Sequence, residues 1–284
     1  MIGTITALFL RIFSNPFSNV LQKHLTITGC KPFSVNFFTY TGLSIFCLPF
    51  IGIIDFSNIP LLTYKYALLG GICGAIGNGF LVKALEKGDL SLLGPINSYK
   101  SVVAMLFGIF FLKEIPDIAG IYGIFLIIYG SYFVFETQNE GFSLTLFKRR
   151  DIQYRIFALV FTAIEAVFMK HVIILSGVMV SFILTCWFGS VFSFLIVYMS
   201  RQEFLPCRKD LKELFLLLIT TGIMQWSTNY VFKHMNVSYA LALFQLSTIL
   251  SVIFGWKFFE ERHIKKKLLG SFIMITGAVI LILL

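Results

Sequence analysis

The sequence contains few charged residues and few of the residue types on which most enzymes depend. Asp, Glu, Lys and Arg make up 13% of its 284 residues, about half of the ~25% typical of soluble domains. Only four histidines occur, all at the edges of apolar runs and none with a second histidine at ligand spacing. The motifs GxGxxG, GxxxxGKS/T, HExxH and GxSxG are absent. We therefore expect no enzyme activity, no cofactor and no metal site.

The five cysteines also lack the spacing of a metal site or of a redox motif. We interpret them as small apolar fillers or free thiols. The first residues, MIGTITALFL, lack the basic segment and the A-x-A-like cleavage site of a secretory signal. We expect them to stay in the protein as the start of a membrane span.

Long apolar runs account for most of the chain, which is 57% hydrophobic. A membrane-spanning helix needs about 20 mostly apolar residues. Ten such runs can be marked, at residues 2–22, 33–54, 64–83, 91–112, 117–136, 155–174, 178–199, 213–232, 238–258 and 267–284. The sequence therefore predicts an all-α membrane protein with ten transmembrane helices.

The chain also repeats itself at an offset of 147 residues. The matching positions include Lys23/Lys170, Gly42/Gly189, Gly108/Gly255, Glu114/Glu261, Gly123/Gly270 and Gly130/Gly277. Each unit contains five apolar runs, and an odd number of spans turns the second unit upside down relative to the first. We predict two inverted five-helix repeats, at residues 1–137 and 148–284, joined by a loop at 138–147.

Lysine and arginine are concentrated in alternate loops. The loops after the odd-numbered runs hold 17 of the 23, the other loops hold four, and Arg11 and Lys100 fall within runs. The positive-inside rule then places the odd loops in the cytoplasm and both termini outside. We interpret the net charge of +9 as a topological signal and expect no binding of nucleic acid.

Two segments carry a recognisable pattern, KALEKGDLSLLGPINSYKSVVAMLFGIFFLKE at 83–114 and FKHMNVSYALALFQLSTILSVIFGWKFFEE at 232–261. In each, small residues lead into a helix that ends in an acidic residue, and a glycine follows nine residues later. This pattern resembles the EamA domain, the unit of the drug/metabolite transporter superfamily, and covers nearly the whole chain as two copies. The resemblance implies a ten-helix carrier of small metabolites that works by alternating access. Ten-span relatives usually keep both termini in the cytoplasm, opposite to the charge distribution here.

Polar residues within the apolar runs are the candidate substrate site, because such groups are expensive in a bilayer. Arg11, Asn15 and Asn19 recur every four residues and share one helical face. Lys100 lies about ten residues from either end of its run, and its uncompensated charge there costs about 3 kcal/mol. Glu165 is its candidate partner, or that of Arg11.

The charges at Lys100 and Glu165 are not shared by the two repeats, where the equivalent residues are Ser247 and Ser18. A buried ion pair, a proton-coupling carboxylate and a pair opened by substrate all remain open. The structural alternatives are helix–helix contact for the polar candidates, snorkelling to the headgroups for Arg11, and core packing for the aromatic pair Tyr40 and Trp187. The further substrate-binding candidates are Tyr40, Asn78, Asn97, Tyr99, Trp187, Gln225, Trp226, Asn229 and Gln245.

Two buried cations against one carboxylate leave one positive charge in excess. We therefore predict a secondary active or facilitative transporter of a small polar, anionic or zwitterionic, amino-acid-like metabolite. A sugar-phosphate or nucleotide-type carrier of the same fold and a non-transporting membrane scaffold are the alternatives. The expected partners are a small-molecule substrate, membrane lipid and protons as a candidate coupling ion. We expect a monomer or homodimer in a bacterial inner (plasma) membrane.

Overall fold

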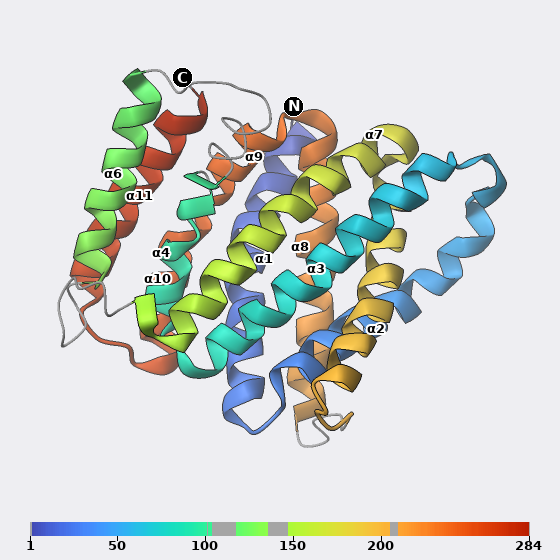
Figure 1. The fold of residues 1–284 in the computed structure, drawn as a ribbon, viewed down its shortest axis with the longest axis horizontal. Helices are drawn as coiled ribbons and strands as arrows, with labels where there is room; N and C mark the ends of the chain where they lie inside the picture. Colours follow the sequence, from blue (N-terminus) through green and yellow to red (C-terminus); the bar gives the residue numbers. More distant parts are fainter. Residues whose placement is uncertain (1, 101, 104–117, 136–146, 205–209, 284) are drawn as a thin grey trace.

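The computed structural model describes the chain except residues 1, 101, 104–117, 136–146, 205–209 and 284 (Figure 1). Every regular element in this part is a helix and none is a strand, which confirms the all-helical prediction for these residues. The elements are α1 (Ile2–Ile27), α2 (Pro32–Cys47), two 3-10 helices (Leu48–Ile53 and Phe56–Asn58), α3 (Leu61–Lys87), α4 (Leu90–Ile96), α6 (Ile118–Phe135), α7 (Arg150–Met199), α8 (Leu211–His234), α9 (Val237–Phe244), α10 (Ser247–Phe259) and α11 (Ile264–Leu283).

Four segments of the described residues are long and apolar enough to cross a membrane: Pro32–Ile53, Leu61–Lys87, Arg150–Met199 and Tyr239–Phe259. A shorter apolar helix covers Ile118–Val134. In lipid, a helix satisfies all backbone hydrogen bonds within its own segment, which is why these runs form helices. Residues 101 and 104–112 of the predicted run at 91–112 lie outside the described residues.

Helix α7 contains two of the predicted runs in one element of 50 residues. Its backbone leaves the helical conformation at Gly177, where φ is 82° and ψ is 177°. Only glycine adopts this region without strain. The chain therefore turns at Gly177 between the runs predicted at 155–174 and 178–199.

Two helices are interrupted near the middle of the molecule. Helix α4 contains Pro95 and ends at Ile96, and bonds between residues three apart follow, from Ser98 N to Pro95 O and from Lys100 N to Asn97 O. Helix α9 ends at Phe244 and passes into α10 through a similar tight turn. The two interruptions meet, because Asn97 Nδ2 donates to Gln245 Oε1 at 3.3 Å.

Helices α6 and α11 lie side by side at one end of the molecule (Figure 1). Their backbones meet at glycines: a Cβ on Gly130 would lie 2.8 Å from the carbonyl oxygen of Gly270, and one on Gly277 would lie 2.6 Å from that of Gly123. Gly123 faces Gly277 and Gly130 faces Gly270, so the residue numbers run in opposite directions and the two helices are antiparallel. Small residues permit this close approach, which is common where membrane helices pack.

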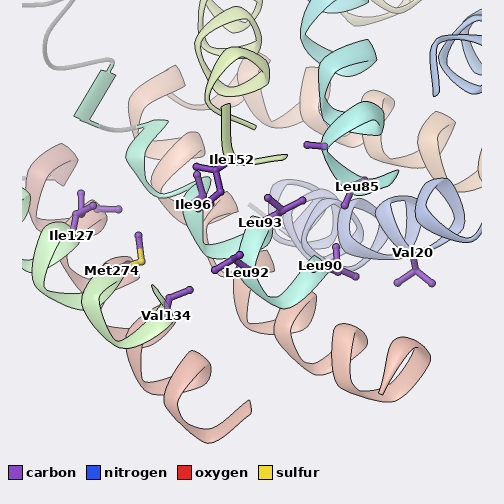
Figure 2. Packing of buried hydrophobic residues seen from close by; sticks show 12 residues of the cluster. Val20, Leu85, Leu90, Leu92, Leu93, Ile96, Ile127, Val134, Ile152 and Met274 are labelled. Atoms are coloured by element: carbon purple, nitrogen blue, oxygen red, sulfur yellow. The ribbon is translucent and has the colours of Figure 1, made fainter. Parts of the chain in front are cut away.

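A cluster of buried apolar side chains connects six helices beside this contact, as Figure 2 shows in close-up. Its members are Val20, Ala84, Leu85, Leu90, Leu92, Leu93, Ile96, Ile127, Val134, Ile152, Met274 and Ala278. Since lipid is as apolar as these side chains, close packing rather than exclusion of water stabilises such a cluster in a membrane.

Large apolar side chains also cover much of the outer surface. On α6 the exposed ones recur every three or four residues, at Ile118, Ile121, Tyr122, Phe125, Ile128, Tyr129 and Tyr132. A helical face of this kind fits contact with lipid acyl chains.

Cys30, between α1 and α2, is disulfide-bonded. The interpretation of all five cysteines as fillers or free thiols is therefore wrong for this residue. Cys47, Cys73 and Cys186 are free thiols.

Candidate functional site: a cationic polar cavity

A cavity of about 100 Å³ lies between α1, α3, α7, α8, α9 and the segment that follows α4. Nine of the residues predicted from polarity within apolar runs line it: Arg11, Asn15, Asn19, Asn78, Asn97, Lys100, Glu165, Gln225 and Asn229. They lie far apart in the sequence, so the fold brings them together.

Arg11 presents its guanidinium group to this cavity. The group lies over the ring of Phe244, 4.7 Å from the ring centroid. Its Nε and Nη1 atoms are buried and have no hydrogen-bond partner among the described residues. Because an unpaired buried donor carries a large desolvation penalty, these two atoms indicate a place where an acceptor can bind.

Lys100 and Glu165 face the same cavity, and each is only 9% exposed. Lys100 Nζ donates to Thr162 Oγ1 at 3.4 Å. None of the ion pairs within 4.0 Å between described residues involves Glu165. The two side chains thus share a cavity without forming a closed ion pair.

Arg155 is a third cation of the cavity, which the sequence analysis missed. It is buried, and it donates from Nε to Leu93 O and from Nη2 to Asn97 Oδ1, both at 2.9 Å. The sequence analysis counted Arg155 with the loops because it is the first residue of its apolar run. Helix α7 begins five residues earlier, at Arg150, and this carries Arg155 into the protein. The cavity therefore holds three cations and one carboxylate.

Tyr40 lies in a second, adjoining cavity of about 40 Å³. Its hydroxyl accepts a hydrogen bond from Asn78 Nδ2 at 2.8 Å. Asn15, Asn19, Asn78 and Gln225 line both cavities, so the two spaces adjoin.

Four predicted residues line neither cavity. Tyr99 donates to Ser131 Oγ of α6 at 2.8 Å, Trp187 stacks on Phe56, and Trp226 packs edge-on against Phe182 and is 40% exposed. Gln245 is buried and accepts a hydrogen bond from Asn97, which lines the first cavity. For Trp187, the core-packing alternative describes its stacking on Phe56.

Apolar helices around a cavity of charged and amide side chains are typical of a membrane protein that handles a polar ligand. The sequence profile of the EamA-like transporter family matches residues 2–136 and 152–283. The chain therefore belongs to the EamA-like transporter family of the drug/metabolite transporter superfamily, which confirms the resemblance seen in the sequence. Members of this family are multi-pass integral membrane transporters and not enzymes.

No curated protein sequence matches the chain. Among solved structures 23 chains match. One of them, described only as the crystal structure of a protein, is 17% identical with a TM-score of 0.64, and the match covers 99% of this chain and 96% of that one. At this identity the likeness supports the fold alone.

Proposed function

We propose that the protein is a secondary active or facilitative transporter of a small anionic or zwitterionic, amino-acid-like metabolite. The observation that carries this proposal is the cavity with three buried cations, one carboxylate and two unpaired donors on Arg11. A substrate carboxylate or phosphate supplies the missing negative charge and accepts charge-assisted hydrogen bonds from the Arg11 guanidinium.

The proposed architecture is ten transmembrane helices in two inverted repeats. Two contacts support it: α1 packs against α8, and α3 packs against the first part of α7. Adding 147 to the residue numbers of α1 gives the first part of α7, and adding 147 to those of α3 gives α8. The contact between α1 and α8 therefore corresponds to the contact between the first part of α7 and α3. The antiparallel α6 and α11 are also equivalent under this shift, as an inverted repeat requires.

Alternating access would use the two interrupted helices. Transporters of inverted-repeat type commonly place the substrate beside discontinuous helices near the bilayer midplane. Here the interruptions after α4 and α9 meet through Asn97 and Gln245, next to Lys100. The repeats rocking about this point would open the cavity to each side in turn. The small volume of the cavity favours an amino-acid-sized substrate over a nucleotide.

Ligand binding to the purified protein tests the proposal, because a ligand that binds the folded state raises the melting temperature. Amino acids, sugar phosphates, nucleotides and organic cations form the panel. We expect stabilisation by small carboxylates or phosphates, and transport of the same compounds into proteoliposomes. Stabilisation by cations only would contradict the proposal.

Lys100→Met tests the role of the buried charge. Loss of one partner of a desolvated charge pair costs about 2 kcal/mol or more, which weakens anion binding roughly 30-fold. Lys65→Met is the matched control, since Lys65 is exposed. Full transport of an anion by Lys100→Met would exclude the proposed site.

Protons are the proposed coupling ion, with Glu165 as the group that carries them. In the same vesicles, an imposed pH gradient should drive uptake by the unmodified protein but not by Glu165→Gln. Equal gradient dependence in both proteins would remove Glu165 from this role.

A further inference from the structure

The second cavity differs in chemistry from the cationic one. It is enclosed by α1, α2, α3, α7 and α8, and none of the described residues that line it is charged. Hydroxyl and amide groups supply its polar surface. A substrate that reaches from the first cavity into this one therefore meets a charged end and a neutral polar end.

Most of the polar groups in the second cavity are occupied by other parts of the protein. Ser18 Oγ donates to Thr220 Oγ1 at 3.0 Å. Asn36 Nδ2 donates to Ala75 O and Ser193 Oγ, both at 3.1 Å. These bonds fix the wall of the cavity and leave those donors with little capacity for a ligand.

Two atoms in this wall are buried and have no hydrogen-bond partner among the described residues: Gln22 Oε1 and Thr221 Oγ1. Gln22 is only 6% exposed and lies on α1, one helical turn beyond Ser18, while Thr221 lies on α8 beside Thr220. Buried polar groups are nearly always hydrogen-bonded. Two unpaired groups on one small cavity therefore point to a bound molecule that supplies the partners.

We infer that this second cavity is a subsite for the uncharged end of the substrate, and that this end carries hydroxyl or carboxamide groups. The transported molecule is then a small carboxylate or phosphate with a hydroxylated or amidated tail. The hydroxyl of Thr221 can donate and accept, and the amide of Gln22 can accept through oxygen or, if flipped, donate through nitrogen. An aliphatic tail would leave both groups unpaired, so the subsite selects against it.

This inference rests on the proposed transport function, and matched ligand pairs separate the two. The pairs are L-serine with L-alanine, L-glutamine with L-norleucine, and glycerate with lactate, titrated against the full-length protein in a thermal-shift assay. We expect the polar member of at least one pair to bind ~10-fold more tightly than its partner.

Thr221→Val and Gln22→Leu each remove one unpaired group while keeping the approximate volume. Each should reduce the preference for the polar member to within about threefold. Lys100→Met should weaken both members of a pair alike, because both carry the same anionic group. Thr276→Val, which removes an exposed hydroxyl bonded only within α11, should keep the full preference.

The possible outcomes distinguish failure of the subsite inference from failure of the transport proposal. If anions bind without preference for polar tails, or if Thr221→Val and Gln22→Leu both keep the preference, the second cavity is a water-filled space and this inference is wrong. The transport proposal would stand in that case. If no member of any pair binds the unmodified protein, the proposed function fails and this inference fails with it.

Discussion

Gly74 of α3 makes the space in which the Glu165 carboxylate lies. A Cβ on Gly74 would be 2.5 Å from Glu165 Oε1 and 3.2 Å from the hydroxyl of Tyr40. These distances are too short for ordinary contact, so Gly74→Ala must displace the carboxylate. Overpacking of this kind costs about 1–3 kcal/mol. We expect a lower melting temperature and weaker ligand binding.

A double variant separates this clash from a general helix effect. Gly74→Ala combined with Glu165→Ala should recover part of the lost stability, because the shorter side chain removes the contact. Gly52→Ala is the control, since nothing lies within 4 Å of a Cβ at that position. Additive losses in the double variant would show that Gly74 does not act through Glu165.

Nine of the polar residues predicted within apolar runs line the first cavity, while Tyr99 and Gln245 do not. Arg11, Lys100 and Glu165 all reach it, because a charge in the middle of a membrane helix needs a polar surrounding. The two tryptophan candidates line neither cavity, since Trp187 and Trp226 pack against other rings. Arg155 could not be assigned from the sequence, because its burial depends on where its helix begins.

Glu261, which follows the end of α10, connects that helix to the start of α4 through hydrogen bonds. Its carboxylate accepts a hydrogen bond from Lys23 Nζ at 2.7 Å, and its two oxygens accept from Leu90 N at 2.8 Å and Ser91 N at 2.7 Å. It therefore satisfies two of the free N–H groups in the first turn of α4. In the sequence this glutamate is one of the positions that match between the repeats, and in the structure it connects the second family segment to Lys23 and α4 of the first.

Acid should weaken this link. Burial acts to raise the pKa of Glu261, but the Lys23 ammonium and the hydrogen bonds from Ser91 outweigh it and hold the pKa below its usual value. A depressed pKa contributes stability above the pKa of the unfolded chain, about 4.3, which is lost as the pH falls through the folded pKa. We expect Glu261→Gln to lower the free energy of unfolding by about 3 kcal/mol at neutral pH. The unmodified protein should show a drop in melting temperature as the pH falls through the pKa of Glu261, and this variant should lack that drop.

Glu260→Gln is the matched control for that measurement. Glu260 is the preceding residue and is exposed, so its loss should change the melting temperature little. If the melting temperature of Glu261→Gln falls with pH as it does in the unmodified protein, other carboxylates cause the fall, and the role given to Glu261 is contradicted.

For the whole molecule, the distribution of charge and the disulfide at Cys30 predict different orientations in the membrane. Of the 17 cations counted in the odd loops, Lys23, Arg155 and Lys267 are buried. This leaves 14 against four, and the positive-inside rule still predicts both termini outside. The disulfide at Cys30 points the other way, because disulfides form in oxidising compartments and this loop is one of those assigned to the cytoplasm.

Reporter fusions at each terminus decide between these two observations. A fusion partner that is active only outside the cytoplasm should report at both ends if the charge distribution sets the orientation. Activity of a cytoplasmic reporter at both ends would instead agree with the disulfide and with the usual arrangement of ten-span relatives. Signals on opposite sides at the two ends would contradict an even number of spans.

The sequence by itself determined that the chain is helical, that it is built for a membrane and that it belongs to a two-copy transporter family. Hydropathy and the 147-residue offset are local or periodic properties, so they can be read without contacts. Only the tertiary structure decided which polar groups share a cavity, that Arg155 adds a third cation and that Gln22 and Thr221 are unpaired. These facts depend on where helices begin, break and cross, and long-range packing sets them.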